Sequence, residues 1–295
     1  GILVLDTSKT YGKYKNKFYY KIIPDDLRIP EFLVPYKLRI TFEKKQFNKY
    51  VLFKFNHWKY KHPVAQIEQI LGNVNILENY YEYKLYCKKL NASNKVFTKN
   101  TLRKLKEDGN IKKKICLKYD PEDRRNWRGY TIDPKNSKDF DDAFSIKKEK
   151  EKTFLSIYIS NVSFWLESME LWDSFSQRIS TIYLPNTKIP MLPTILSDNI
   201  CSLQEEEERF AFTLDILFIN DVMIKYEFKN TYIKVVKNYR YETPALLANK
   251  DYQNLYSFIK TINKKNKYVE EINTSHDVIQ YMMIYMNYIS SKKMA

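Results

Sequence analysis

Four aspartates fall within ten residues of the chain, at Asp133, Asp139, Asp141 and Asp142. Pro134 directly follows the first of them, so we expect a strand to end at Asp133. A tight loop over residues 135–138 would then return the other three carboxylates beside it. Carboxylates that lie close together repel one another unless a cation neutralises them. Oxygen ligands without His or Cys favour Mg²⁺, with Mn²⁺ as the alternative, and such an ion can activate water and hold a phosphate for in-line attack.

The spacing of these aspartates leaves one other interpretation open, a solvated acidic turn without a metal. A calcium loop of the EF-hand type is excluded, because its central Gly and its distant Glu are absent. The three cysteines, Cys87, Cys116 and Cys201, are odd in number and far apart. They predict neither a disulfide framework nor a zinc site and favour a reducing compartment, the cytoplasm with the nucleus as an alternative.

The aspartates stand in a stretch of sequence that resembles the catalytic (RNB) domain of the ribonuclease II/R exoribonucleases, in the style of its eukaryotic and viral members. The motifs that carry the resemblance follow one another in order over about residues 121–290. They are Thr131-Ile132-Asp133-Pro134, Lys138-Asp139-Phe140-Asp141-Asp142-Ala143, Arg178, Tyr183-Leu184-Pro185, Ile189-Pro190-Met191-Leu192-Pro193, Leu196-Ser197-Asp198, Cys201-Ser202-Leu203 and Arg209-Phe210-Ala211-Phe212.

The resemblance implies a Mg²⁺-dependent enzyme that degrades single-stranded RNA from its 3′ end and releases nucleoside 5′-monophosphates. It implies that Asp133, Asp139 and Asp142 hold one Mg²⁺ and that Asp141 supports a second ion or the attacking water. It also implies that Tyr183 stacks on the base at the 3′ end, and it assigns Arg178 to the RNA.

The chain departs from the family pattern at several places. Asn161 stands where the family usually has an aspartate, and Gln280 stands near the position of an expected glutamate. The later arginine-bearing motif and the C-terminal RNA-binding module have no counterpart in this sequence. We therefore expect the N-terminal part of a catalytic domain, completed by the missing C-terminal segment or by a further chain. The alternative function is a catalytically inactive RNA-binding protein that retains the RNB fold, although all four aspartates remain.

The excess of positive charge lies entirely in the first 120 residues. These contain 26 Lys+Arg and 11 Asp+Glu, a net charge of 26 − 11 = +15, and the rest of the chain contains 24 of each. A basic segment attracts a polyanion, of which nucleic acid is the commonest. Lysine drift in a genome rich in A and T is the other explanation, but drift should affect both halves.

Residues 1–95 are expected to form a small β-barrel of the OB or cold-shock type that binds RNA. Short runs of strand composition lie at residues 18–23, 32–36 and 50–55, and the segment 27–36 resembles the module that precedes the catalytic domain in the family. Such barrels stack bases on exposed aromatics, for which Tyr20, Phe53 and Trp58 are our candidates. In an alternating strand about half of such residues must face the core.

The remaining segments complete an α+β fold, a small barrel followed by the N-terminal part of a mixed α/β RNB domain. Residues 64–89 look helical, residues 96–120 look like a basic connector, and residues 121–295 form the catalytic part. There we predict mostly antiparallel strands at 154–159, 210–219 and 226–236 and helices at 252–263 and 275–290. The last helix is apolar on nearly every face, which predicts an uncovered apolar patch. No apolar run is long enough for a membrane span.

Overall fold

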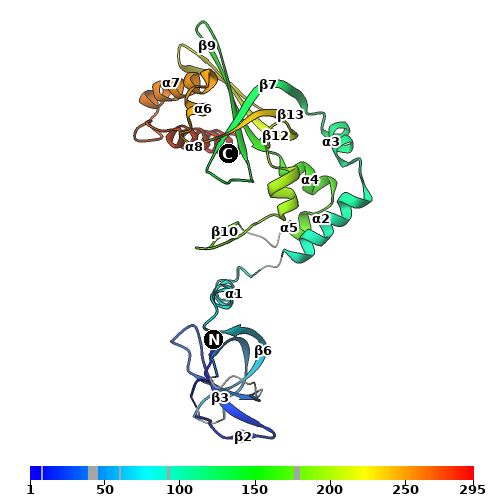
Figure 1. Ribbon diagram of the computed structural model, residues 1–295, viewed down its shortest axis with the longest axis vertical. Coiled ribbons are helices and arrows are strands. Elements are labelled where there is room, and N and C mark those ends of the chain that lie inside the picture. The colour runs from blue at the N-terminus through cyan, green and yellow to red at the C-terminus, as the bar shows by residue number, and fades with distance from the viewer. Residues whose placement is uncertain (8, 39–45, 60, 92–93, 176–179) are drawn as a thin grey trace. The chain divides into compact units, whose positions relative to one another are not determined.

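A computed structural model describes residues 1–7, 9–38, 46–59, 61–91, 94–175 and 180–295 (Figure 1). The chain divides into two compact units, Gly1–Ala92 and Ser93–Ala295. The first unit is a small barrel with one helix, and the second is a larger barrel with helices packed around it. The predicted α+β fold of two successive parts is therefore confirmed.

The described residues of the first unit form six strands and one helix. These are β1 (Ile2–Leu3), β2 (Lys13–Tyr14), β3 (Lys17–Ile23), β4 (Phe32–Tyr36), β5 (Lys49–His57), β6 (Val64–Asn73) and α1 (Leu77–Cys87). Strand β1 pairs with both β3 and β5, so the pairings close into the ring β1-β3-β4-β6-β5. Only the β4–β6 contact in this ring is parallel among the described strands. A closed five-stranded barrel of this size is an OB-type fold.

The helix expected over residues 64–89 is wrong in its first half. Residues 64–73 form β6, and only α1 at residues 77–87 is helical. Strand β6 pairs with β5 from Val64 opposite His57 to Asn73 opposite Lys49. These ladder hydrogen bonds to a distant segment outweigh a local apolar spacing that is ambiguous between helix and strand.

The second unit begins with two helices and then alternates strands with short helices. Its elements are α2 (Lys95–Glu107), α3 (Ile111–Tyr119), β7 (Glu122–Asp133), β8 (Asp142–Glu149), β9 (Lys152–Ser160), α4 (Val162–Ser168), α5 (Trp172–Phe175), β10 (Ile182–Tyr183), β11 (Lys188–Ile189), the π-helix η1 (Leu196–Ile200), β12 (Glu208–Ile219), β13 (Val222–Arg240), α6 (Pro244–Leu247), α7 (Lys250–Lys265) and α8 (Ser275–Met294).

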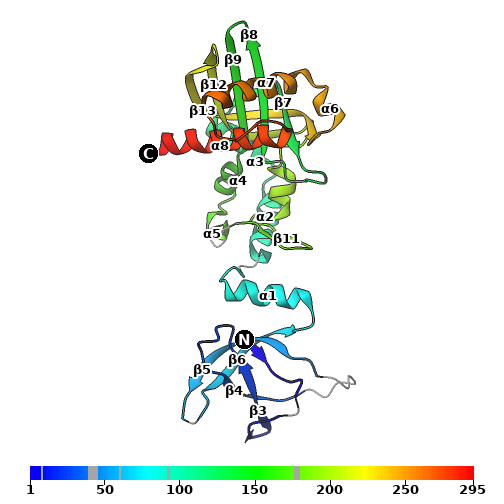
Figure 2. The same ribbon diagram turned by 90° about the vertical axis from the view of Figure 1, so that its left-hand side faces the viewer.

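Five of these strands close into a barrel in the order β7-β8-β9-β12-β13. Only the β13–β7 contact in it is parallel among the described strands, so the expected antiparallel character is confirmed. Helices α7 and α8 cover one side of the barrel (Figure 2). The large core on that side includes Phe144, Leu214, Phe258 and Tyr281. Among the described residues, no helix is long and apolar enough to cross a membrane.

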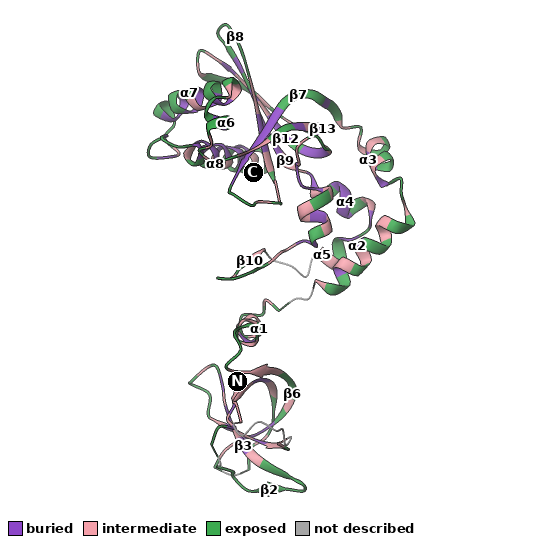
Figure 3. Ribbon diagram, in the orientation of Figure 1, coloured by how far each residue is buried: buried purple, intermediate pink, exposed green. Residues whose placement is uncertain are grey.

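The segment 96–120, expected as a connector, folds as α2 and α3. Its apolar side chains Phe97, Ile111 and Ile115 are buried in a core with Phe164 and Trp165 of α4. Its lysines lie mostly on the outer side (Figure 3). The lysine-rich composition therefore describes one face of two amphipathic helices and not an unstructured linker.

The apolar helix α8 is largely covered by the second unit. Seven of its ten apolar residues between 278 and 289 are buried, and the only one of the ten that is exposed is Tyr288. The uncovered apolar patch expected from the sequence is therefore wrong. The barrel and α7 supply contacts on more sides of the helix than the sequence pattern could indicate.

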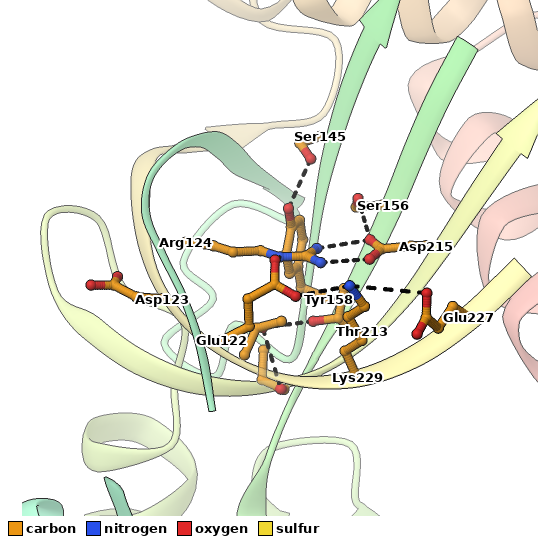
Figure 4. A network of polar contacts seen from close by, with 12 residues as sticks. Glu122, Asp123, Arg124, Ser145, Ser156, Tyr158, Thr213, Asp215, Glu227 and Lys229 are labelled. Carbon is orange, nitrogen blue, oxygen red and sulfur yellow. Dashed lines mark hydrogen bonds and ion pairs between the residues drawn. The ribbon is translucent and has the colours of Figure 1, made fainter. Parts of the chain in front are cut away.

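A buried arginine lies at one end of the barrel (Figure 4). The Arg124 guanidinium donates to both carboxylate oxygens of Asp215, at 2.8 and 2.5 Å, and to Glu122 at 2.8 Å. Trp127 stacks over it, with 4.2 Å from Cζ to the ring centroid. Strand β7 bulges here. Arg124 pairs with Ile233 of β13 and Gly129 pairs with Val235, so four residues of β7 lie opposite a single residue of β13. The bulge lets Trp127 cover the ion pair.

Candidate functional site

The aspartate loop joins β7 to β8 in the way its sequence predicts. Strand β7 ends at Asp133 and β8 begins at Asp142. A turn follows Pro134, whose carbonyl accepts from the amide of Ser137 at 3.3 Å, and Asn136 takes the left-handed conformation that Asn tolerates. Neighbouring strands fix both ends of the loop: Asp133 pairs with Arg240 of β13 and Asp142 with Ile159 of β9.

The middle of this loop is held by Ser202, which is fully buried. Its hydroxyl accepts from the amide of Phe140 at 3.0 Å and donates to the carbonyl of Lys138 at 2.8 Å. The amide of Leu203 donates to the carbonyl of Phe140 at 2.8 Å. These bonds orient the backbone on both sides of Asp139. The Cys201-Ser202-Leu203 motif was visible in the sequence, but its contact with the loop was not.

Two carboxyls of the loop are held in surroundings that disfavour their charge. Burial, followed by the nearby charges of Asp133 and Asp141, raises the pKa of Asp142 to about 7. Burial also raises the pKa of Asp133 to about 6, against an opposing bond from Thr131 and with help from Asp141 and Asp139. The Oδ2 atom of Asp133 is buried and has no hydrogen-bond partner among the described residues. The loop therefore contains negative charge that the described side chains do not neutralise.

The other two carboxyls lie nearer a lysine. Part of Asp141 is exposed to solvent. Its carboxyl group is nevertheless surrounded by protein, and this burial, followed by the charge of Asp139 and with a smaller effect of Asp198, raises its pKa. Burial acts to raise the pKa of Asp139 too, but the Lys188 ammonium and backbone amides outweigh it and leave that pKa below its usual value. The Lys188 Nζ atom lies 2.8 Å from Asp139 Oδ2. The sequence motifs do not include Lys188, and they contain Asp198 only as part of Leu196-Ser197-Asp198.

The residues present fit a divalent cation in charge and in donor type. All four candidates are hard carboxylates, and one of their oxygens is buried without a partner. Within the described residues, however, no three His, Cys, Asp or Glu side chains already stand close enough together to hold a metal ion. The convergence of all four carboxylates on one ion therefore stays a prediction.

Tyr183 lies on a two-stranded hairpin that reaches the same loop. It is 76% exposed, and its cross-strand neighbour in β11 is Lys188, the lysine that contacts Asp139. An exposed ring beside a cation next to the carboxylates is suited to a base with an adjoining phosphate. Arg178, the other RNA candidate of this segment, lies outside the described residues.

The aromatic candidates of the first barrel divide into inner and outer residues. Tyr20 is 5% exposed and belongs to the barrel core, so its assignment to RNA stacking is wrong. Phe53 is only half-buried but packs against the same core, with its ring 5.1 Å from that of Phe32. Trp58 is exposed, as is Phe55, which the sequence did not distinguish from its neighbours.

Asn161, the departure from the family pattern, has a structural role here. Its side-chain oxygen accepts from the Ser163 hydroxyl at 2.6 Å and caps helix α4 through the Phe164 amide. Its amide donates to Asn230 at 3.1 Å. An aspartate at position 161 could cap this helix equally well. The contacts of Asn161 therefore give no evidence that this position takes part in metal binding.

Sequence comparison identifies the domain that contains this loop. The family model described as "RNB domain" matches residues 122–257, which include all four aspartates. Residues 122–257 are therefore similar to an RNB domain. A protein named Ribonuclease R from Ureaplasma parvum is 41% identical over 112 residues, 37% of this chain. Ribonuclease R 2 of Lactococcus lactis is 36% identical over 126 residues, 41% of the chain. The matches span only 15% and 19% of those two proteins.

Two solved structures share the fold of this chain. Mycoplasma genitalium RNase R in complex with double-stranded RNA matches with a TM-score of 0.63 and 21% identity, over 90% of this chain and 44% of that one. Yeast Ssd1, described as a pseudonuclease, matches with a TM-score of 0.57 and 11% identity, over 86% of this chain and 33% of that one. At these identities the likeness shows the fold and leaves the activity open.

Proposed function

We propose that this chain is part of a Mg²⁺-dependent 3′→5′ exoribonuclease that degrades single-stranded RNA to nucleoside 5′-monophosphates. The observation that carries the proposal is the uncompensated charge of the aspartate loop within an RNB domain. Asp133 and Asp142 have pKa values raised to about 6 and about 7, and Asp133 Oδ2 is buried without a partner. A loop that only capped a turn would have no need for such crowding.

Asp133, Asp139 and Asp142 would hold the ion, and Asp141 would orient the attacking water or hold a second ion. When bound, Mg²⁺ would supply the Lewis acid that polarises the scissile phosphate and favours ionisation of a water. Ser202 keeps the loop backbone in place, and Tyr183 would stack on the terminal base so that the phosphate next to it is correctly seated. Stacking of this kind is worth roughly 1–3 kcal/mol per base.

A second candidate is an RNA-binding protein with the RNB fold and no catalysis. Asn161 in place of the family aspartate and the likeness in fold to a pseudonuclease favour it. The two candidates agree on RNA binding and differ on turnover. Release of mononucleotides in the presence of Mg²⁺ separates them.

The decisive experiment incubates the protein with a 5′-labelled, single-stranded RNA in the presence of Mg²⁺ or of EDTA. The protein is tested as this chain alone and as this chain joined to the C-terminal segment that we expect from the sequence. We expect mononucleotides and a ladder that shortens from the 3′ end, with Mg²⁺ only. Asp141→Asn should slow this by at least about a hundredfold and change RNA affinity by less than about twofold, because the residue acts in the transition state.

The matched control is Asp120→Asn, an exposed aspartate in a left-handed position that Asn accepts. It removes the same charge from the same unit and should leave the rate unchanged. RNA binding without any Mg²⁺-dependent product would support the second candidate. Equal rates in Asp141→Asn and wild type would place catalysis elsewhere.

A further inference from the structure

One face of helix α2 carries a regular row of cations that the aspartate loop does not use. Lys95, Lys99, Arg103 and Lys106 follow one another at spacings of four, four and three residues. Residues at these spacings lie along one side of a helix, about 5–6 Å apart. All four are exposed, and they line a shallow hollow of about 770 Å³ along the helix. We call these four residues the α2 stripe.

The opposite face of α2 explains why the stripe must face solvent. Phe97 and Thr101 are buried, and the Thr101 hydroxyl donates to the Phe97 carbonyl at 2.9 Å. Asn100 donates to Ser174 of α5, and Lys104 pairs with Glu170 at 2.5 Å. With this inner face packed on the rest of the unit, the four residues of the stripe are exposed to solvent.

The charge of the stripe is only partly compensated. Arg103 pairs with Glu107 at 3.1 Å, an exposed contact that contributes little. Within the described residues, no ion pair is formed by Lys99 or Lys106. The hollow therefore presents four cations and one carboxylate, a net charge of 4 − 1 = +3. A row of evenly spaced cations some 16 Å long, at 1.5 Å per residue, suits a regular polyanion.

The start of the stripe is joined to the proposed 3′-end site by a hydrogen bond. Asn94, which precedes α2, donates its side-chain amide to the carbonyl of Pro190 at 2.8 Å. Pro190 directly follows β11, the strand that carries Lys188 opposite Tyr183. A strand of RNA leaving the ring of Tyr183 thus meets the α2 stripe without leaving this unit. That continuity favours RNA over an acidic protein as the ligand.

We propose that the α2 stripe binds the phosphates of the RNA strand upstream of its 3′ end. The proposal rests on the proposed function for the polarity of the strand, and it assigns a substrate-binding surface outside the aspartate loop. Its contribution is electrostatic and independent of base sequence. The stripe should therefore increase affinity only for RNA long enough to reach it.

The test measures binding of the whole chain to fluorescent oligo(A) of 4, 8, 12 and 16 nucleotides in EDTA, so that cleavage plays no part. The variant is Lys99→Glu/Lys106→Glu. The control is Lys260→Glu/Lys264→Glu, which makes the same charge change on the exposed face of α7. Circular dichroism and melting curves check that both fold.

We expect the affinity of wild type and control to rise with RNA length. The variant should lose about tenfold for 16 nucleotides and little for 4. Its slope of log K against log salt should fall by about 1.4, since each of two single-strand phosphates contributes about 0.7. An equal gain with length in variant and wild type, an equal loss at all lengths, or no binding of oligo(A) by wild type would overturn the proposal.

A loss of binding to poly-glutamate with RNA affinity unchanged would also overturn it and assign the stripe to an acidic protein. The proposed function fails separately. If wild type releases no mononucleotides with Mg²⁺, the nuclease proposal is lost, while the length series in EDTA still decides whether the stripe binds RNA.

Discussion

The ammonium of Lys188 lies 2.8 Å from Oδ2 of Asp139, so a cation of the chain itself already contacts the aspartate loop. Both side chains are about one-third exposed, at 36% and 29%. The lysine comes from the hairpin that carries Tyr183. A divalent ion bound by Asp139 would have to share this carboxylate with Lys188 or displace it. Metal binding and the position of the hairpin are therefore expected to be coupled.

Lys188→Met should make the protein more dependent on Mg²⁺ for stability. Without metal, the variant loses the cation that offsets the carboxylates, so its melting temperature in EDTA should fall. With Mg²⁺ the competitor is gone, so the stabilisation by the ion should exceed that of wild type. Lys135→Met, an exposed lysine of the same loop, serves as the control. A smaller Mg²⁺ effect in Lys188→Met than in wild type would show that Lys188 supports the ion and does not compete with it.

Asp142 should make the stability of the metal-free protein fall as pH rises. Its pKa in the folded state, about 7, is above its ordinary value of 3.8, so the folded state binds the proton more tightly than the unfolded chain. This contribution is fully present below pH 4 and is lost as pH rises through about 7. Asp142→Asn keeps the group neutral, so between pH 5 and pH 8 the stability of the variant relative to wild type should rise by on the order of 2–3 kcal/mol.

Melting curves in EDTA at pH 5 and pH 8 measure this difference. The control is Asp123→Asn, because the bond from Arg125 holds the pKa of Asp123 down to about 2 and the group stays charged throughout this range. The control should therefore show no gain on wild type at pH 8. If the difference in stability between Asp142→Asn and wild type is the same at both pH values, the pKa of Asp142 is not raised by its surroundings.

The sequence was sufficient to predict the strand ends near the aspartate loop, but not the long-range contacts that hold the loop in place. Pro134 after Asp133 was enough to predict where β7 ends, and the apolar alternation was enough for β12. The contact of Ser202 with the loop joins residues 62 apart in the chain, and that of Lys188 with Asp139 joins residues 49 apart. Such distances are fixed by the closure of the barrel and the packing of the hairpin, which no local pattern encodes.

The first barrel shows a second limit. Strand periodicity predicts that about half of the aromatics face inward but not which half. On β5, Val51 is fully buried and Phe53 packs against the core, whereas Phe55, two residues further along the same face, is exposed. On β3, Tyr20 faces the core. Knowing which aromatics are exposed required the strand pairing itself.

Ser202→Ala should weaken both the fold and the metal response. The substitution leaves the Phe140 amide and the Lys138 carbonyl without their side-chain partner, at a cost of about 1–3 kcal/mol. Because these bonds orient the loop on both sides of Asp139, the stabilisation by Mg²⁺ should also shrink. Ser145→Ala, which removes a hydroxyl bonded to Tyr158 in the same barrel, should cost stability but leave the Mg²⁺ effect intact. If Mg²⁺ stabilises the two variants to the same extent, Ser202 does not position the aspartate loop for the ion.

The ion pair of Arg124 and Asp215 should be needed for stability mainly because Arg124 cannot reach water. The Arg124 side chain is 1% exposed and that of Asp215 is 23% exposed. Asp215→Ala leaves a buried guanidinium without its principal partner, which costs roughly 3–5 kcal/mol.

The double variant Arg124→Met/Asp215→Leu removes both charges and should recover most of that loss, since apolar residues of similar volume often replace a buried pair without penalty. Urea denaturation of Arg124→Met, Asp215→Leu and the double variant measures the coupling. The exposed pair Asp123 and Arg125, on the same strand, is the control, and its removal should change stability much less than Asp215→Ala does. If Asp215→Ala costs no more than this control, or if the double variant is as unstable as Asp215→Ala, Arg124 does not depend on Asp215 for its place in the barrel.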